Sequence, residues 1–169
     1  GEAQSALILI RKLLERDTSL SILVTTGTKT SAEMMQKKLP ERTIHQYYPL
    51  DYPKWVKRFL DHWRPDFIFW MESELWPNML MNIQKRNIPA ALINARLSPR
   101  SYKRWSMLPD SIKSVLDTFS LVLCQTEQEY GYFKDLGAHN VHVSDNVKYS
   151  AAPLSFDETD LQKLKNSTE

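Results

Sequence analysis

Short apolar runs alternate with helix-like segments along this chain, and that alternation limits the possible folds more than any other feature. The apolar runs, rich in β-branched residues, occupy 20–26, 43–49, 66–71, 88–95, 119–124 and 140–144. Amphipathic segments lie between them at 31–39, 53–63, 77–86, 109–117 and 127–137. Continuous apolar runs separated by helices are typical of parallel strands buried on both faces. The sequence therefore predicts an α/β fold with a doubly wound, mainly parallel sheet.

Helix boundaries can be predicted from a few residues. Pro53, Pro77 and Pro109 stand where helices should begin, because proline suits the first helical position. Thr30 and Glu33 have capping-box spacing and predict the start of the first of those helices. Gly137 follows an apolar segment as a helix-ending glycine does.

The first segment, 2–17, has the apolar spacing of a helix, yet no strand precedes it. In a doubly wound sheet a helix normally follows a strand, and the first strand is usually central. We therefore expect a sheet that lacks its first strand and is interrupted near its centre. Residues 1–152 are expected to form one Rossmann-like domain, and the polar tail 153–169 a linker or terminal helix.

Composition excludes several classes of protein. The 22 basic and 20 acidic residues leave a net charge of +2, which gives no sign of nucleic-acid binding. The single cysteine, Cys124, excludes an internal disulfide framework, and its apolar run favours a buried side chain over a nucleophile. No stretch reaches the roughly 20 apolar residues needed to cross a bilayer. The histidines lack metal-ligand spacing, so a protein metal site is not expected.

Candidate functional residues are expected in the loops after the strands, because ligands of open α/β sheets lie beyond the carboxyl ends of the strands. Glu72 follows the run 66–71, and Trp70 and Trp76 flank it. Glu74 stands near the start of a helix, where a negative charge is favourable. Both carboxylates could face a cleft or simply decorate a helix entrance. The spacing favours the cleft for Glu72 and the helix entrance for Glu74.

Three further segments carry polar side chains at strand ends. Glu2 would lie at the same edge if a strand preceded it, although its spacing alone favours an ordinary first-turn acid over a functional residue. The turn 25–31, "TTGTKTS", offers backbone amides for an anion, or is a capped turn without a ligand. The loop 94–105 gathers Arg96, Arg100, Tyr102 and Trp105, which suits phosphates, a sugar or a membrane interface better than a purely solvated loop. Lys148 follows the last strand and would by itself be an ordinary exposed lysine.

These pieces, in this order, resemble the N-terminal half of the 3-deoxy-D-manno-octulosonic acid (Kdo) transferases, glycosyltransferases of bacterial lipid A synthesis. The resemblance covers the chain up to about Ala152. It rests on the quoted motifs "TTGTKTSAEMM", "YYPLDYP", "HWRPDFIFWMESELWPNML", "IPAALINARLSPRS" and "NVKYSA".

The resemblance implies a GT-B-type architecture of two Rossmann-like halves. It implies inverting transfer of Kdo from the donor CMP-Kdo to a lipid A precursor, with no metal and no cofactor. Glu2 matches the proposed general base of the family, and Glu72 and Lys148 match positions credited with stabilising the transition state.

The phosphates and sugars of the acceptor would be bound by the turn 25–31 and the loop 94–105. The candidates are Thr26, Gly27, Thr28, Arg96, Ser98 and Arg100. The resemblance also implies a peripheral protein at the cytoplasmic face of the bacterial inner membrane, with partners at the membrane surface and no nucleic acid. An anchoring helix would precede Gly1, and a donor-binding half would follow Glu169.

One departure and two alternatives accompany the resemblance. Asp145 replaces a glycine usual in the family, and only glycine adopts positive φ without cost. Without a donor half, the isolated chain is expected to be inactive, and without its first strand it is expected to be marginally stable, because an interrupted sheet leaves backbone groups unpaired. It could instead be a truncated, catalytically inactive Rossmann-like binding module. An unrelated nucleotide-sugar enzyme would require a phosphate-cradling glycine loop, which the sequence lacks.

Overall fold

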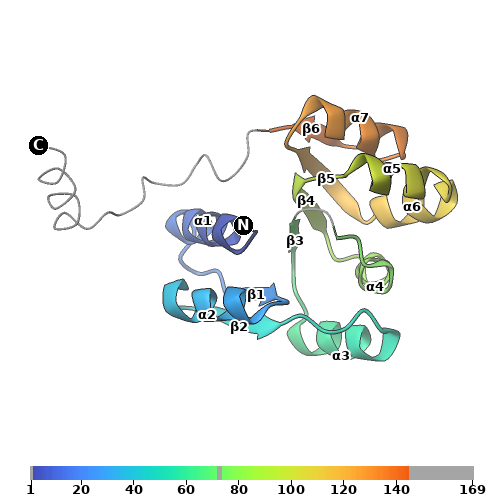
Figure 1. Ribbon diagram of the computed structural model, residues 1–169. Helices are drawn as coiled ribbons and strands as arrows, with labels where there is room; N and C mark the ends of the chain where they lie inside the picture. The colour runs from blue at the N-terminus through green and yellow to red at the C-terminus, as the bar shows by residue number, and fades with distance from the viewer. Residues whose placement is uncertain (1, 72–73, 145–169) are drawn as a thin grey trace, which may run out of the picture.

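The computed structural model describes residues 2–71 and 74–144 and confirms the predicted α/β alternation (Figure 1). The strands are β1 (Ile22–Thr26), β2 (Thr43–Tyr47), β3 (Ile68–Met71), β4 (Ala90–Ala95), β5 (Phe119–Cys124) and β6 (Val141–Val143). The helices are α1 (Glu2–Arg16), α2 (Lys29–Lys38), α3 (Pro53–Trp63), α4 (Pro77–Lys85), α5 (Pro99–Ser106), α6 (Pro109–Leu116) and α7 (Glu127–Asp135). All six predicted runs contain a strand, and the fold is Rossmann-like.

The strands form two parallel sheets. One sheet pairs β1 with β2, and the other has the order β3-β4-β5-β6. In the described part of the chain, no backbone pairing joins β1 to β3. The division falls between the first two strands and the rest, and it agrees with the expectation of an interrupted sheet.

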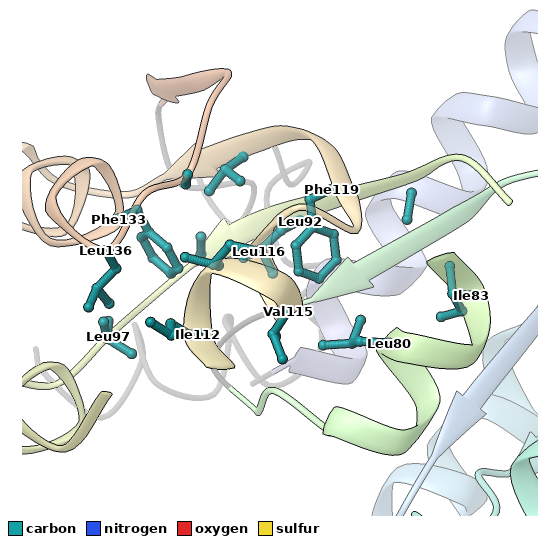
Figure 2. Close-up of a cluster of buried hydrophobic side chains, with 14 of the residues drawn as sticks. Leu80, Ile83, Leu92, Leu97, Ile112, Val115, Leu116, Phe119, Phe133 and Leu136 are labelled. Atoms are coloured by element: carbon teal, nitrogen blue, oxygen red, sulfur yellow. The ribbon is translucent and has the colours of Figure 1, made fainter. Parts of the chain in front are cut away.

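Each sheet has its own hydrophobic core. The larger core lies between the four-stranded sheet and helices α3, α4, α6 and α7, and Figure 2 shows ten of its labelled side chains, from Leu80 to Leu136. The smaller core joins α1, β1 and α2 through Leu7, Ile10, Val24 and Met35. The chain therefore builds two unequal packing units.

Burial on both sides of the sheet holds for β4 but not for its neighbours. Every residue of β4 is buried. In β3, Phe69 remains 42% exposed, and Phe67 just before it is 45% exposed. Both line a groove of about 480 Å³ on the face opposite α4, to which α1 contributes Leu9. The prediction that both faces of the sheet are buried was wrong for β3. The face that carries Phe67 and Phe69 is only partly covered, and α1 contributes Leu9 to the groove there.

Most predicted helix boundaries are confirmed. Pro53, Pro77 and Pro109 each occupy the first turn of a helix, and Gly137 follows α7 with a φ of +94°. The capping box was wrong. Thr28, not Thr30, caps α2, and its hydroxyl accepts a hydrogen bond from the Ser31 amide at 3.2 Å.

The predicted loop 94–105 was wrong over its second half, because α5 begins at Pro99. Ser98 caps this helix by accepting a hydrogen bond from the Ser101 amide. A serine followed by proline is itself a helix-start signal that could have predicted the helix. No helix in the described part of the chain has the length and apolar character needed to cross a bilayer.

Candidate functional site

Parallel pairing brings the carboxyl ends of neighbouring strands to one edge of each sheet. Thr26 pairs with Tyr47 in the smaller sheet, and Met71 pairs with Ile93 in the larger one. The segments that follow paired strands therefore leave each sheet at the same end, where ligands of parallel sheets bind.

The turn after β1 is closely packed. The Thr26 hydroxyl lies 2.8 Å from His45 Nε2 on β2. Tyr48 covers Gly27 so closely that a β-carbon at this position would lie 2.0 Å from the Tyr48 hydroxyl oxygen. Gly27 is needed here for close approach of a side chain, and Thr28 is needed as the cap of α2.

A row of aromatic rings connects this turn with the larger sheet. The Tyr48 and Trp76 rings meet edge to face with centroids 4.3 Å apart, and Trp76 meets Trp70 in the same way at 5.5 Å. Both indoles also hold Glu74. Trp70 donates to its carbonyl at 2.8 Å, and Trp76 donates to its carboxylate at 3.2 Å. The helix-entrance interpretation of Glu74 agrees with this geometry.

The entrance of α4 is capped by a residue far away in the sequence. Its own N-cap residue, Trp76, makes no side-chain cap hydrogen bond. Instead Asp51 accepts from the Asn78 amide at 3.1 Å and from the Met79 amide at 2.8 Å. The Asn78 side-chain amide donates back to the Asp51 carbonyl. The segment after β2 is therefore fastened to the segment after β3.

Strand β4 ends with an irregular backbone. Asn94 is buried at 3% exposure and has a φ of 56°, which asparagine tolerates better than most residues. The β4–β5 register shifts between Leu92 and Ala95. Arg96 follows this irregularity, and its Nε lies 3.9 Å from Glu129 Oε1 on α7. Arg100 is exposed on α5.

Two aromatic residues of α5 contribute to packing. Tyr102 stacks on Tyr132 with ring centroids 4.2 Å apart and donates a hydrogen bond to Asp135. The hydrogen bond to Asp135 raises the pKa of Tyr102. Trp105 packs against the larger core. Both rings are half-buried, because α5 places Tyr102 against α7 and Trp105 against the larger core, so only part of each ring is free to contribute to the predicted binding surface.

The structure brings only some of the predicted residues together. Thr26, Gly27 and Thr28 form one turn on the smaller sheet, and residues 96–100 follow the larger one. Across the described ranges, no hydrogen bond or ion pair joins these two groups.

The structure does not describe the side chains of the three predicted catalytic residues. Glu2 is the first residue of α1, and its side chain is outside the description. Glu72 and Lys148 lie outside the described residues, as do Asp145 and the tail 153–169.

Sequence reasoning missed Tyr48 and Asp51, although both lie in the motif "YYPLDYP". An aspartate beside prolines indicates a turn, and aspartate is a common capping residue. Its partner helix, however, begins 26 residues later at Pro77, and capping from such a distance leaves no local spacing to recognise.

Cys124 is fully buried, as predicted. Burial raises the pKa of its thiol to about 12, with a smaller contribution from the charge of Glu129. Such a thiol stays protonated and unreactive near neutral pH. In the described part of the chain, no group of three His, Cys, Asp or Glu side chains could hold a metal ion.

Residues 1–151 match the family described as 3-deoxy-D-manno-octulosonic-acid transferase (kdotransferase). The chain belongs to this family. The strand-end segments described above, up to β6, all fall within the matched range. The resemblance drawn from the motifs is thereby confirmed.

Relatives from distant organisms agree with the assignment to the Kdo transferases. The 3-deoxy-D-manno-octulosonic acid transferase of Rickettsia felis is 32% identical over 98% of this chain and 36% of its own length. A probable mitochondrial 3-deoxy-D-manno-octulosonic acid transferase of Arabidopsis thaliana is 43% identical over 72% of this chain and 28% of its own. The 3-deoxy-D-manno-octulosonic acid transferase of Haemophilus influenzae is 33% identical over 88% of this chain and 35% of its own length. The chain thus spans about a third of these relatives' length.

Proposed function

We propose that this chain is the acceptor-side part of an enzyme that transfers Kdo from CMP-Kdo to a lipid A precursor, with inversion and without a metal. The observation that carries the proposal is the family match over residues 1–151, which includes every strand-end segment of the described fold. The bacterial relatives above carry the same transferase name.

The proposed chemistry needs one base and compensating charge. Glu2 takes the proton of the acceptor hydroxyl as the new bond forms, on the face opposite the departing CMP. Departure of CMP leaves a sugar with the character of an oxocarbenium ion. Glu72 offers it negative charge, and Lys148 steadies the sugar carboxylate or the leaving phosphate.

The acceptor's phosphates and sugars are assigned to the two strand-end segments. The turn Thr26, Gly27 and Thr28 opens α2, where backbone amides and the helix dipole favour an anion. Arg96 and Arg100 are exposed and carry guanidinium groups that suit phosphate, and Ser98 lies between them at the start of α5. The Thr26 hydroxyl is already hydrogen-bonded to His45, so its backbone is the better contact.

We place this activity at the cytoplasmic face of the bacterial inner membrane, where an acyl-chain acceptor would be presented. The segment after β2 supports a membrane contact. Leu50 is 75% exposed, Tyr52 60% and Trp55 45%, and Lys54 and Arg58 lie exposed beside them. Tyrosine, tryptophan and basic side chains are favoured at the interface of a bilayer.

Transfer by the longer protein that contains this sequence would test the proposed function. Glu2→Gln should lower Kdo transfer to a lipid A precursor by about 10²-fold or more, since a general base contributes at least that much. Glu15→Gln is the matched control, because Glu15 is exposed near the other end of the same helix. Full activity of Glu2→Gln would remove the assigned base, and the absence of any Kdo transfer by the unaltered protein would overturn the function.

The alternative is a catalytically inactive Rossmann-like binding module. It predicts acceptor binding without transfer in any longer form of the protein. Two measurements on the same preparation, binding of the acceptor and formation of the Kdo product, separate the two functions.

A further inference from the structure

Asp51 makes an unusual set of contacts for a residue outside any helix or strand. Its two carboxylate oxygens accept from the first free amides of α4, at 3.1 Å from Asn78 and 2.8 Å from Met79. The Asn78 side chain returns a hydrogen bond to the Asp51 carbonyl at 2.9 Å. Four amides at the start of a helix lack partners within it, so a carboxylate at this place is strongly held.

The residues on either side of this contact carry the aromatic row. Tyr48, three residues before Asp51, covers Gly27 and meets Trp76. Trp76 directly precedes α4 and donates to the Glu74 carboxylate. A shift of the α4 entrance would therefore move Trp76, and with it the ring that closes over the Gly27 turn.

We propose that Asp51 is a positioning residue for acceptor recognition. By capping α4 from the segment after β2, it holds Tyr48 and Trp76 together and so fixes the shape of the Gly27 turn. Asp51 itself touches no substrate. This inference rests on the proposed function, because it assigns that turn to the acceptor.

The physical reason for a distant cap lies in the divided sheet. No described backbone pairing joins β1 to β3, so the position of the smaller sheet relative to α4 depends on side-chain contacts. A carboxylate that accepts two amides is directional, whereas edge-to-face aromatic contacts tolerate small shifts. Asp51 therefore supplies the geometric precision and the rings supply the apolar contact.

The test uses this chain with its five tryptophans replaced by 5-fluorotryptophan. The fluorine NMR signals of Trp70 and Trp76 are assigned by substituting each tryptophan in turn. The variants are Asp51→Ala, the milder Asp51→Asn, and Thr126→Ala as the control. Thr126 caps α7 by accepting a hydrogen bond from the Glu129 amide. Thr126→Ala therefore removes a helix cap that does not contact the aromatic row. The measurements are amide exchange, the Trp70 and Trp76 signals, and binding of the deacylated, phosphorylated disaccharide headgroup of a lipid A precursor.

In Asp51→Ala, the amides of Asn78 and Met79 should exchange about five- to tenfold faster, as expected for the loss of a cap. The Trp76 signal should move, and the disaccharide should bind about tenfold more weakly, with a smaller change for Asp51→Asn. Thr126→Ala should leave the Trp76 signal unchanged, and it serves as the control for this signal only, because the Thr126 hydroxyl also donates to Glu129, the ion-pair partner of the proposed acceptor contact Arg96. Faster exchange in Asp51→Ala with an unmoved Trp76 signal and unchanged binding would overturn the inference and leave Asp51 as a plain cap.

Two other outcomes are also decisive. If Asp51→Ala does not fold, Asp51→Asn gives the same three measurements. If the unaltered chain binds no disaccharide, the acceptor assignment fails. The Trp76 signal then still decides whether Asp51 fixes the aromatic row, since that measurement needs no ligand.

Discussion

The two sheets of this chain differ in how they are stabilised. The larger sheet rests on a core of 19 buried apolar residues among those described, and β4 is buried at every position. The smaller sheet has a core of four such residues, and β2 exposes Ile44 and Tyr47 at about half of their surface, 51% and 52%. Buried apolar area drives folding, so the larger unit should hold most of the stability. The proposed acceptor turn at Gly27 belongs to the smaller unit, so its position depends more on contacts from outside the turn, such as the Tyr48 ring.

Phe133→Ala should give the largest effect. Phe133 is 1% exposed within the larger core, and loss of a buried phenylalanine costs about 3–5 kcal/mol. Urea unfolding measures this change. Labelling of the buried Cys124 thiol should accelerate as the larger core opens. Phe67→Ala is the control, because Phe67 is 45% exposed, and a cost equal to that of Phe133→Ala would contradict the comparison.

Met35→Ala should weaken the smaller unit. Met35 is fully buried between α1, β1 and α2, and loss of such a side chain costs about 2–5 kcal/mol. We expect faster amide exchange in β1 and α2, while β4 and β5 stay protected and the Cys124 labelling rate is unchanged. A single sharp melt at high temperature, lowered as a whole by this substitution, would show that the two units unfold as one.

Gly27→Ala should cost about 1–3 kcal/mol, because the new methyl group forces the Tyr48 ring to move. The cost comes from this clash, so the same change in a Tyr48→Ala background should cost much less. Urea unfolding of the two single variants and the double variant gives the coupling between the positions. Equal costs in both backgrounds would show that Tyr48 does not brace the turn.

Asp61→Asn should give the smallest effect. Hydrogen bonds from Arg86 and Lys57 lower the pKa of Asp61 below its ordinary value of 3.8. A lowered pKa means that its contribution is present above the unfolded-state pKa and is lost as the pH falls through the folded-state pKa. The contacts of Asp61 with Lys57 and Arg86 lie at the surface and are screened by solvent, so the free energy of unfolding at pH 7 should change little in Asp61→Asn. Stability measured by urea between pH 5 and 2.5 should fall less steeply in Asp61→Asn than in the unaltered chain; identical slopes would exclude this contribution.

Much of the fold could be predicted because its signals are local. The run 119–124 is strand β5 residue for residue, and 53–63 is helix α3, since proline at the start and apolar spacing along the helix act within one segment. Where the local signal was misassigned, the prediction failed. The sequence predicts a cap at Thr30, whereas Thr28 caps α2, and it predicts a loop at Ser98 and Pro99, where α5 begins.

The candidate site could be predicted only in outline. Strand ends indicated the turn at Gly27 and the segment at Arg96, because parallel sheets gather their carboxyl ends at one edge. The inward turn of Tyr102 was not predictable, since it depends on Tyr132 and Asp135, about 30 residues later on another helix.

The sequence by itself determined the order of strands and helices, the family, and the strand ends where acceptor contacts are proposed, because each depends on neighbouring residues or on a motif. Only the tertiary structure decided that Asp51 caps α4, that Tyr48 covers Gly27, and that one face of β3 stays open. These features depend on residues far apart in the chain. Their contacts exist only after the packing units have formed, and no spacing along the sequence records them.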